Sequence, residues 1–252
     1  MQNDRSPRLA VLIDADNASA KIAAALFEEI AKIGEASVRR IYGDFSKAQS
    51  KPWADVLTEY AIVPHQQFAY TTGKNASDIT LVIDAMDLLH SGRVDGFCLV
   101  SSDSDFTRLA SRIREHGLGV YGFGEQKTPK SLQQACHRFF HTENLLRSEE
   151  ISIATPIKDR PPSLKTITPI VKKAIEQVEG EDGWAHLGGV GTQLLKLEPS
   201  FDTRSWGFRR LIDLVRQIEG IEVDHGDGKA PRLRQKRSGD ASSGKPLPAK
   251  KK

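Results

Sequence analysis

This chain of 252 residues contains only two cysteines and no apolar run long enough to cross a membrane. A membrane-spanning helix needs about 20 apolar residues, and the polar stretch 1–8 lacks the apolar core of a signal peptide. Cys98 and Cys136 lie far apart, without the paired spacing typical of zinc sites or disulfide frameworks. We therefore expect buried thiols, no membrane partner and a cytoplasmic location.

The charge is distributed unevenly, although the formal net charge is only +3. Residues 229–252 contain nine lysines and arginines and one aspartate, so this stretch carries +8 and the rest of the chain −5. Lys and Arg bind nucleic-acid phosphates by displacing condensed counterions, whereas an acidic surface needs a cation to approach them. A basic tail on an acidic body favours a nucleic-acid partner, with a solvated, solubilising tail as the alternative.

Apolar strands alternate with amphipathic helices in the first part of the chain. Leu9–Ile13 and Gly96–Val100 are continuous apolar runs, typical of strands buried on both faces. Further strands are expected at 37–42, 62–68 and 119–123, and helices at 18–33, 53–60, 77–90 and 106–116. The helix at 77–90 is expected to bury a stripe made of Ile79, Val82, Ile83, Met86 and Leu89. This alternation predicts an α/β fold, with helices covering both faces of a parallel sheet.

A segment rich in Pro, Ser and Thr separates this domain from a smaller one. Beyond it, three amphipathic helices are expected at 164–178, 187–197 and 205–218, followed by short β segments at 221–224 and 231–234. We predict an α/β domain at 1–147, a linker at 148–162, a winged-helix-like domain at 163–236 and a basic disordered tail at 237–252.

Aspartates follow two of the expected buried strands. Asp14 comes directly after the first strand, Asp103 and Asp105 follow the strand at 96–100, and Asp78 opens the helix between them. Ligands of α/β sheets bind beyond the carboxyl ends of the strands, so these aspartates are expected to converge. Clustered carboxylates repel one another unless a cation neutralises them, and such oxygen ligands suit Mg²⁺ or Mn²⁺. A metal ion there can activate water for phosphodiester hydrolysis.

Several of these polar residues have a structural alternative. Asp and Asn are common in turns and at helix N-termini, so Asp105 and Asn17 are also candidate helix caps. Lys74 can contact a phosphate or remain a solvated loop lysine. Asp14-x-Asp16 is similar to the start of haloacid dehalogenase-type phosphatases, but Asn17-Ala18 departs from the residue types that this family has at the next two positions.

Three motifs occur in order in the first domain: Leu-Ile-Asp14-Ala-Asp-Asn17, Lys74-Asn-Ala-Ser-Asp78 and Leu-Val-Ser101-Ser-Asp103-Ser-Asp105-Phe106. Together they resemble the NYN domain, a PIN-like ribonuclease fold, over about residues 7–146. The resemblance implies a PIN-like strand order and RNA cleavage that depends on Mg²⁺ or Mn²⁺. It also implies that the acidic, metal-binding positions are Asp14, Asp78, Asp103 and Asp105, with Asn17 as a polar catalytic residue.

The second domain resembles the OST-HTH, or LOTUS, domain, an RNA-binding winged helix, on the strength of Trp184 and Trp206-Gly-Phe208-Arg-Arg-Leu211. The resemblance makes Arg204, Arg209 and Arg210 candidate phosphate ligands, although they also fit a solvated helix face. The aromatic residues fit a core as well as base stacking. This domain is also the candidate surface for a homo-oligomer or a protein partner. The leading hypothesis is thus a metal-dependent ribonuclease, an endonuclease, and the alternative is a non-catalytic RNA-binding adaptor.

Overall fold

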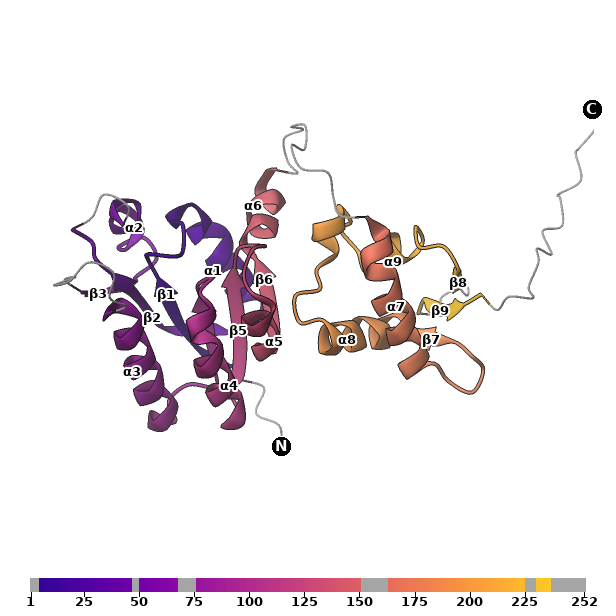
Figure 1. Ribbon diagram of the computed structural model, residues 1–252, viewed down its shortest axis with the longest axis horizontal. Helices are drawn as coiled ribbons and strands as arrows, with labels where there is room; N and C mark the ends of the chain where they lie inside the picture. The colour runs from indigo at the N-terminus through magenta and orange to yellow at the C-terminus, as the bar shows by residue number, and fades with distance from the viewer. Residues whose placement is uncertain (1–4, 47–49, 68–75, 151–162, 225–229, 237–252) are drawn as a thin grey trace, which may run out of the picture. The chain divides into compact units, whose positions relative to one another are not determined.

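The protein is described by a computed structural model, in which residues 5–46, 50–67, 76–150, 163–224 and 230–236 are placed (Figure 1). The chain divides into two compact units, one comprising residues 1–160 with 198–202 and the other 161–197 with 203–252. No helix within the described ranges is long and apolar enough to span a membrane.

The first unit is built on a six-stranded parallel sheet with the order β3-β2-β1-β4-β5-β6. Its strands are β1 (Arg8–Asp14), β2 (Glu35–Gly43), β3 (Val63–Gln66), β4 (Gly96–Val100), β5 (Gly119–Gly124) and β6 (Arg138–His141). Strand order reverses between β1 and β4, which are neighbours in the sheet but far apart in sequence. In doubly wound sheets this reversal opens a crevice at the carboxyl ends of the two strands.

Helices cover both faces of the sheet, as the continuous burial of β1 requires. Leu12 belongs to the apolar core beneath α3 (Ala76–Ser91), α4 (Thr107–Glu115) and α5 (Lys130–Ala135). Ile13 belongs to the core beneath α1 (Ala23–Ala31), α2 (Lys51–Val56) and α6 (Thr142–Glu150). Two 3₁₀ turns, Ala20–Ile22 and Ser104–Phe106, precede α1 and α4. The predicted parallel α/β fold is confirmed.

The expected apolar stripe of α3 is wrong in two positions. Ile79 and Ile83 are exposed, at 61% and 55%, and the residues buried from this helix are Leu81, Ala85, Leu88 and Leu89. The two patterns differ by about one residue, a rotation of about 100° around the helix. Tertiary packing decides between them, since Asp84 accepts hydrogen bonds from Arg40 and Tyr42 of β2 and fixes the rotation of α3.

Other boundaries also differ from those expected. Helix α2 ends at Val56, and the pattern did not predict α5, β6 or α6. The single helix expected at 205–218 is split into a 3₁₀ turn, Thr203–Trp206, and α9, Leu211–Val215. Gly207, with φ of 82°, lies between them, and this left-handed conformation interrupts a right-handed helix.

The second unit is a small domain of helices and a sheet, as the sequence predicted, and its sheet has a third strand, β7, beyond the two β segments that were expected. Helices α7 (Leu164–Val178), α8 (Leu187–Leu197) and α9 accompany an antiparallel sheet with the order β7-β9-β8. Its strands are β7 (Ala185–His186), β8 (Ile221–Asp224) and β9 (Arg232–Gln235). Val171, Leu194, Leu214 and Leu233 are fully buried and form its core.

Candidate functional site

Asp14 ends β1 at the strand-order reversal and is almost completely buried, with 1% exposed. Its Oδ2 accepts hydrogen bonds from Ser101 Oγ at 2.7 Å and from Asn17 Nδ2 at 2.8 Å. Its Oδ1 accepts from the backbone N–H of Asp16 at 3.1 Å. Burial raises the pKa of Asp14, and the hydrogen bonds oppose this shift. These contacts hold the carboxylate in one orientation at the carboxyl end of the sheet.

Ser101 is a site residue to which the sequence analysis gave no role. The register pairs Ile13 of β1 with Val100 of β4, so the next residues, Asp14 and Ser101, come side by side. The Ser101 hydroxyl donates to Asp14 and accepts from the backbone N–H of Asp103 at 3.0 Å. The available signal was its position directly after a buried strand, which it shares with Asp14.

Asp103 begins the 3₁₀ turn that precedes α4 and acts as its N-cap. Its side chain accepts from the backbone N–H of Asp105 at 2.9 Å. The helix cap is therefore Asp103, and Asp105, the residue considered for that role, is exposed in the first turn. The cap turns the chain at the end of β4 so that both aspartates lie close to α3.

Asp78 lies in the first turn of α3 and is half-buried. Burial, followed by the charges of Asp14, Asp103, Asp16 and Asp105, raises its pKa to about 6. Desolvation and like charge both favour the protonated form of a carboxyl group. The four predicted aspartates are thus brought together around Asp78, and Asp16, whose role the sequence left open, is close enough to contribute.

Asn17 and Asp16 form the outer part of this acidic centre, and both are exposed. Asn17 donates to Asp14 rather than capping a helix, because the N-cap of the next helical turn is Ser19. Asp16 Oδ2 accepts a hydrogen bond from Ser77 Oγ at 3.2 Å, which links the loop after β1 to the start of α3.

The predicted RNA-binding residues belong to both units of the chain. Lys74 lies outside the described residues. In the second unit, Arg209 and Arg210 are exposed and Arg204 is half-buried. Arg210 forms an ion pair with Asp213 at 2.8 Å, so its guanidinium is already engaged.

Trp184 is half-buried next to β7, and two guanidinium groups lie close to its ring. The groups of Arg232 and Arg234 lie 5.2 and 4.6 Å from its ring centroid. These arginines also pair with carboxylates, Arg232 with Asp224 and Arg234 with Glu222. The tryptophan is therefore half-buried against these arginines, and it is not among the buried core residues of the described part of this domain.

The donor set fits a hard divalent cation in its chemistry. All the converging side chains offer oxygen, the ligand that Mg²⁺ and Mn²⁺ prefer. Burial, and after it the negative charge of the neighbouring aspartates, raises the pKa of Asp78, and a bound cation would offset that charge. Within the described ranges, however, no three His, Cys, Asp or Glu side chains are grouped closely enough to hold a metal ion as placed.

Similar chains among the solved structures include the following three. VPA0982 of Vibrio parahaemolyticus, a protein of unknown function, is 20% identical with a TM-score of 0.45, covering 55% of this chain and 94% of that one. The uncharacterized protein NE0665 of Nitrosomonas europaea is 30% identical with a TM-score of 0.28, covering 36% and 89%. Fragment 175–257 of a Chromobacterium violaceum protein is 31% identical with a TM-score of 0.25, covering 36% and 97%. No curated protein matches the chain.

Family comparison covers both units. The NYN domain matches residues 8–146, more than half of the chain, and the OST-HTH/LOTUS domain matches residues 162–233. NYN domains form a PIN-like nuclease family, and OST-HTH domains are RNA-binding modules. The six-stranded parallel sheet and the acidic centre at its strand-order reversal agree with the first match. The chain therefore belongs to the NYN domain family and carries an OST-HTH/LOTUS domain C-terminal to it.

Proposed function

We propose that this protein is a metal-dependent endoribonuclease whose acidic centre hydrolyses RNA phosphodiesters. The observation that carries the proposal is the gathering of Asp14, Asp16, Asp103 and Asp105 around the half-buried Asp78, where burial and these charges raise the pKa of its carboxyl group. Helix capping alone does not require several carboxylates at one place, and the repulsion between them lowers the stability of the fold. Functional sites commonly contain such perturbed groups.

The cation would be held by Asp14, Asp78, Asp103 and Asp105, and Mg²⁺ or Mn²⁺ are the ions proposed. When bound, such an ion polarises a phosphoryl oxygen and lowers the pKa of water. Hydrolysis forms a bond between the water oxygen and phosphorus and breaks the bond to the leaving ribose oxygen. One proton of the water passes to a carboxylate of the centre, and the leaving ribose oxygen takes up a proton from solvent.

The chain's own residues orient this chemistry. Ser101 and Asn17 fix the Asp14 carboxylate by hydrogen bonds of 2.7 and 2.8 Å. Asp103 is fixed by its cap interaction with the backbone of Asp105. Rotamers locked by such contacts reduce the reorganisation needed during reaction. The OST-HTH/LOTUS domain and the basic tail are proposed to retain RNA.

A cleavage assay with purified full-length protein tests the proposal. We expect Mn²⁺-dependent cleavage of RNA that EDTA abolishes and that Asp14→Asn or Asp103→Asn eliminates without unfolding the protein. Asp87→Asn is a matched control, because Asp87 is an exposed carboxylate of α3 outside the centre. If wild type cuts no form of RNA with Mn²⁺, or if Asp14→Asn cuts as fast as wild type, the catalytic proposal is wrong.

A second candidate function is a non-catalytic RNA adaptor, and one observation favours it. Both oxygens of Asp14 already accept hydrogen bonds from the chain, which satisfies the carboxylate without a metal ion. Calorimetric titration with Mn²⁺ distinguishes the two functions. Binding that Asp78→Ala abolishes supports the nuclease, whereas RNA binding without any Mn²⁺ binding supports the adaptor.

A further inference from the structure

Two large apolar side chains are exposed at the edge of the acidic centre. Ile79 directly follows Asp78, and Ile83 lies one turn further along α3, with exposures of 61% and 55%. Among the described residues, the third exposed large hydrophobic side chain is Val63, on the edge strand β3. Adjacent exposed apolar side chains commonly mark a binding surface.

The isoleucines lie on the outer side of α3, toward α4. Leu81 and Ala85 point into the core, and Asp84 marks the flank toward β2 through its bonds to Arg40 and Tyr42. Successive residues of a helix are about 100° apart, so Ile79 and Ile83 lie on the outer surface of α3, away from Asp84. His90 lies on the same side, two turns after Ile83, and its ring centroid is 5.4 Å from that of His116, just after α4.

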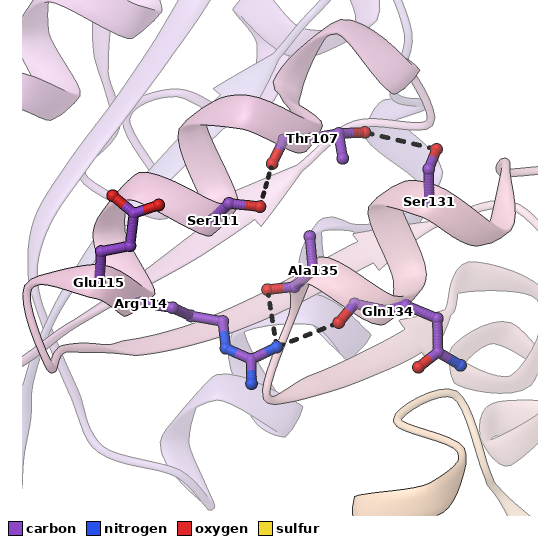
Figure 2. Close-up of a pocket in the computed structure, with 7 residues that line it drawn as sticks. All are labelled: Thr107, Ser111, Arg114, Glu115, Ser131, Gln134 and Ala135. Carbon is purple, nitrogen blue, oxygen red and sulfur yellow. Dashed lines mark hydrogen bonds between the residues drawn. The ribbon is translucent and has the colours of Figure 1, made fainter.

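The side of α4 that faces α3 carries arginines. Figure 2 shows Thr107, Ser111, Arg114 and Glu115 of α4 lining a pocket with Ser131, Gln134 and Ala135 of α5. That side of α4 is therefore turned to α5. Arg112 and His116 lie on the other side of the helix, toward α3, and Arg108 lies on the outer surface between the two sides.

Both arginines are available for a ligand. Arg108 and Arg112 are exposed one turn apart. Among the residues that the structure describes, Arg112 pairs only with Glu115, at 3.2 Å and with side chains 53% and 62% exposed, and such an exposed ion pair contributes little to stability. Within the described part of the chain, the Arg108 guanidinium has no ion-pair partner.

We propose that the α3–α4 surface, defined as Ile79, Ile83, Arg108 and Arg112, binds the single-stranded RNA that leads into the acidic centre. This inference rests on the proposed function and names its substrate class. Arginines attract phosphates that the aspartates alone would repel, and the isoleucines offer an apolar edge to base faces. Only unpaired bases expose those faces, because in a duplex they are stacked and paired. Both edges begin at the acidic centre, next to Asp78 and Asp105.

The first test measures RNA affinity without turnover. Full-length protein carrying Asp14→Asn is titrated, in fluorescence anisotropy, with a short labelled single-stranded RNA and with the same sequence as a duplex. Combining Ile79→Ala and Ile83→Ala is expected to weaken single-strand binding about five-fold and leave duplex binding unchanged. Alanine keeps the helix intact, since it has the highest helix propensity. The matched control is Val63→Ala, which is expected to change neither affinity.

The second test concerns the arginines and the place of contact. Arg108→Gln is expected to weaken single-strand binding several-fold. The salt dependence of the RNA affinity should also fall by the amount that corresponds to about one phosphate contact. Arg93→Gln is the control, because Arg93 is an exposed arginine located before β4. Because the OST-HTH/LOTUS domain is also proposed to bind RNA, 4-thiouridine crosslinking with peptide mapping is used to locate the contact. Crosslinks to α3 or α4 are expected, and the isoleucine variant should lose them.

Defined outcomes overturn the inference. Unchanged single-strand affinity together with no crosslink to α3 or α4 contradicts it. An isoleucine variant that binds RNA normally but changes oligomeric state in light scattering shows that the surface joins two copies of the chain. Equal losses for single-stranded and duplex RNA contradict the substrate class. Since these measurements need no cleavage, a protein without nuclease activity would refute the proposed function and leave this surface to be judged separately.

Discussion

Replacing Asp78 by asparagine is expected to stabilise the protein at neutral pH while abolishing RNA cleavage. The pKa of Asp78 is raised to about 6 from 3.8, so the folded state favours the protonated carboxyl group. Stability from this group is fully present below the unfolded pKa and is lost as the pH rises through about 6. Above pH 7, the ionised side chain therefore opposes folding. Asparagine removes the charge and keeps nearly the same shape.

The size of the pKa shift of Asp78 determines how much stability the asparagine variant gains. Each pKa unit corresponds to about 1.4 kcal/mol, so a rise of this size has an upper limit of about 3 kcal/mol. Asp78 is only half-buried, and solvent screening reduces the figure to about 1–2 kcal/mol. The lost interaction of a first-turn carboxylate with the helix N-terminus offsets about 0.3–1 kcal/mol of it. For a protein of this size, each kcal/mol raises the melting temperature by about 2–4 °C.

The assay is thermal unfolding of wild type and Asp78→Asn at pH 7.5 and at pH 4.5, in EDTA. The stabilisation should be clearly larger at pH 7.5 than at pH 4.5, where Asp78 is already protonated in the folded wild type although the unfolded-state group is still partly ionised. Mn²⁺ should raise the melting temperature of wild type more than that of the variant, because only wild type keeps the full ligand set. Asp87→Asn, the same change on the same helix, should have little effect.

Two results would refute this reasoning. A variant less stable than wild type at pH 7.5 would show that Asp78 is not destabilised by its neighbours. An equal gain at both pH values, or an equal gain in Asp87→Asn, would show that the effect does not come from the titration of Asp78.

Three further predictions concern single side chains. Ser101→Ala should lower the free energy of unfolding by about 1–2 kcal/mol, measured in urea, since buried Asp14 loses its 2.7 Å hydrogen-bond donor. RNA cleavage should fall as well, and a variant with wild-type stability and cleavage would contradict the role of Ser101 in orienting Asp14. Gly124→Ala should cost about 1–3 kcal/mol by calorimetry, because a Cβ there would lie 2.7 Å from the Ser101 carbonyl oxygen. Arg209→Gln should weaken RNA binding several-fold in anisotropy, and Arg210→Gln less, because Arg210 is already paired with a carboxylate.

Local patterns were sufficient for much of the first unit. The continuous apolar runs at β1 and β4 are buried on both faces, and the aspartates follow them as the sequence indicated. The short strand β6 and helices α5 and α6 were missed, since their four to nine residues give too little periodicity to stand out. The resemblance to the NYN domain supplied Asp78 and Asp105 as site residues, because neither of them comes directly after a buried strand.

The rotation of α3 shows where periodicity fails. Its sequence contains apolar residues on most of its circumference, so two stripes about 100° apart were compatible with it. The choice depends on contacts that are distant in sequence, above all the bonds from Arg40 and Tyr42 to Asp84. Those contacts leave Ile79 and Ile83 exposed, and the proposed RNA surface depends on that exposure.

The sequence by itself determined which elements form and which aspartates stand at their ends, because strand burial, helix amphipathicity and capping act over a few neighbouring residues. Only the tertiary structure decided that β1 and β4 are adjacent, which brings Ser101 to Asp14 and makes one centre of separate motifs. Strand order and register result from packing between distant parts of the chain. No local pattern encodes that packing, and the raised pKa of Asp78 exists only because of it.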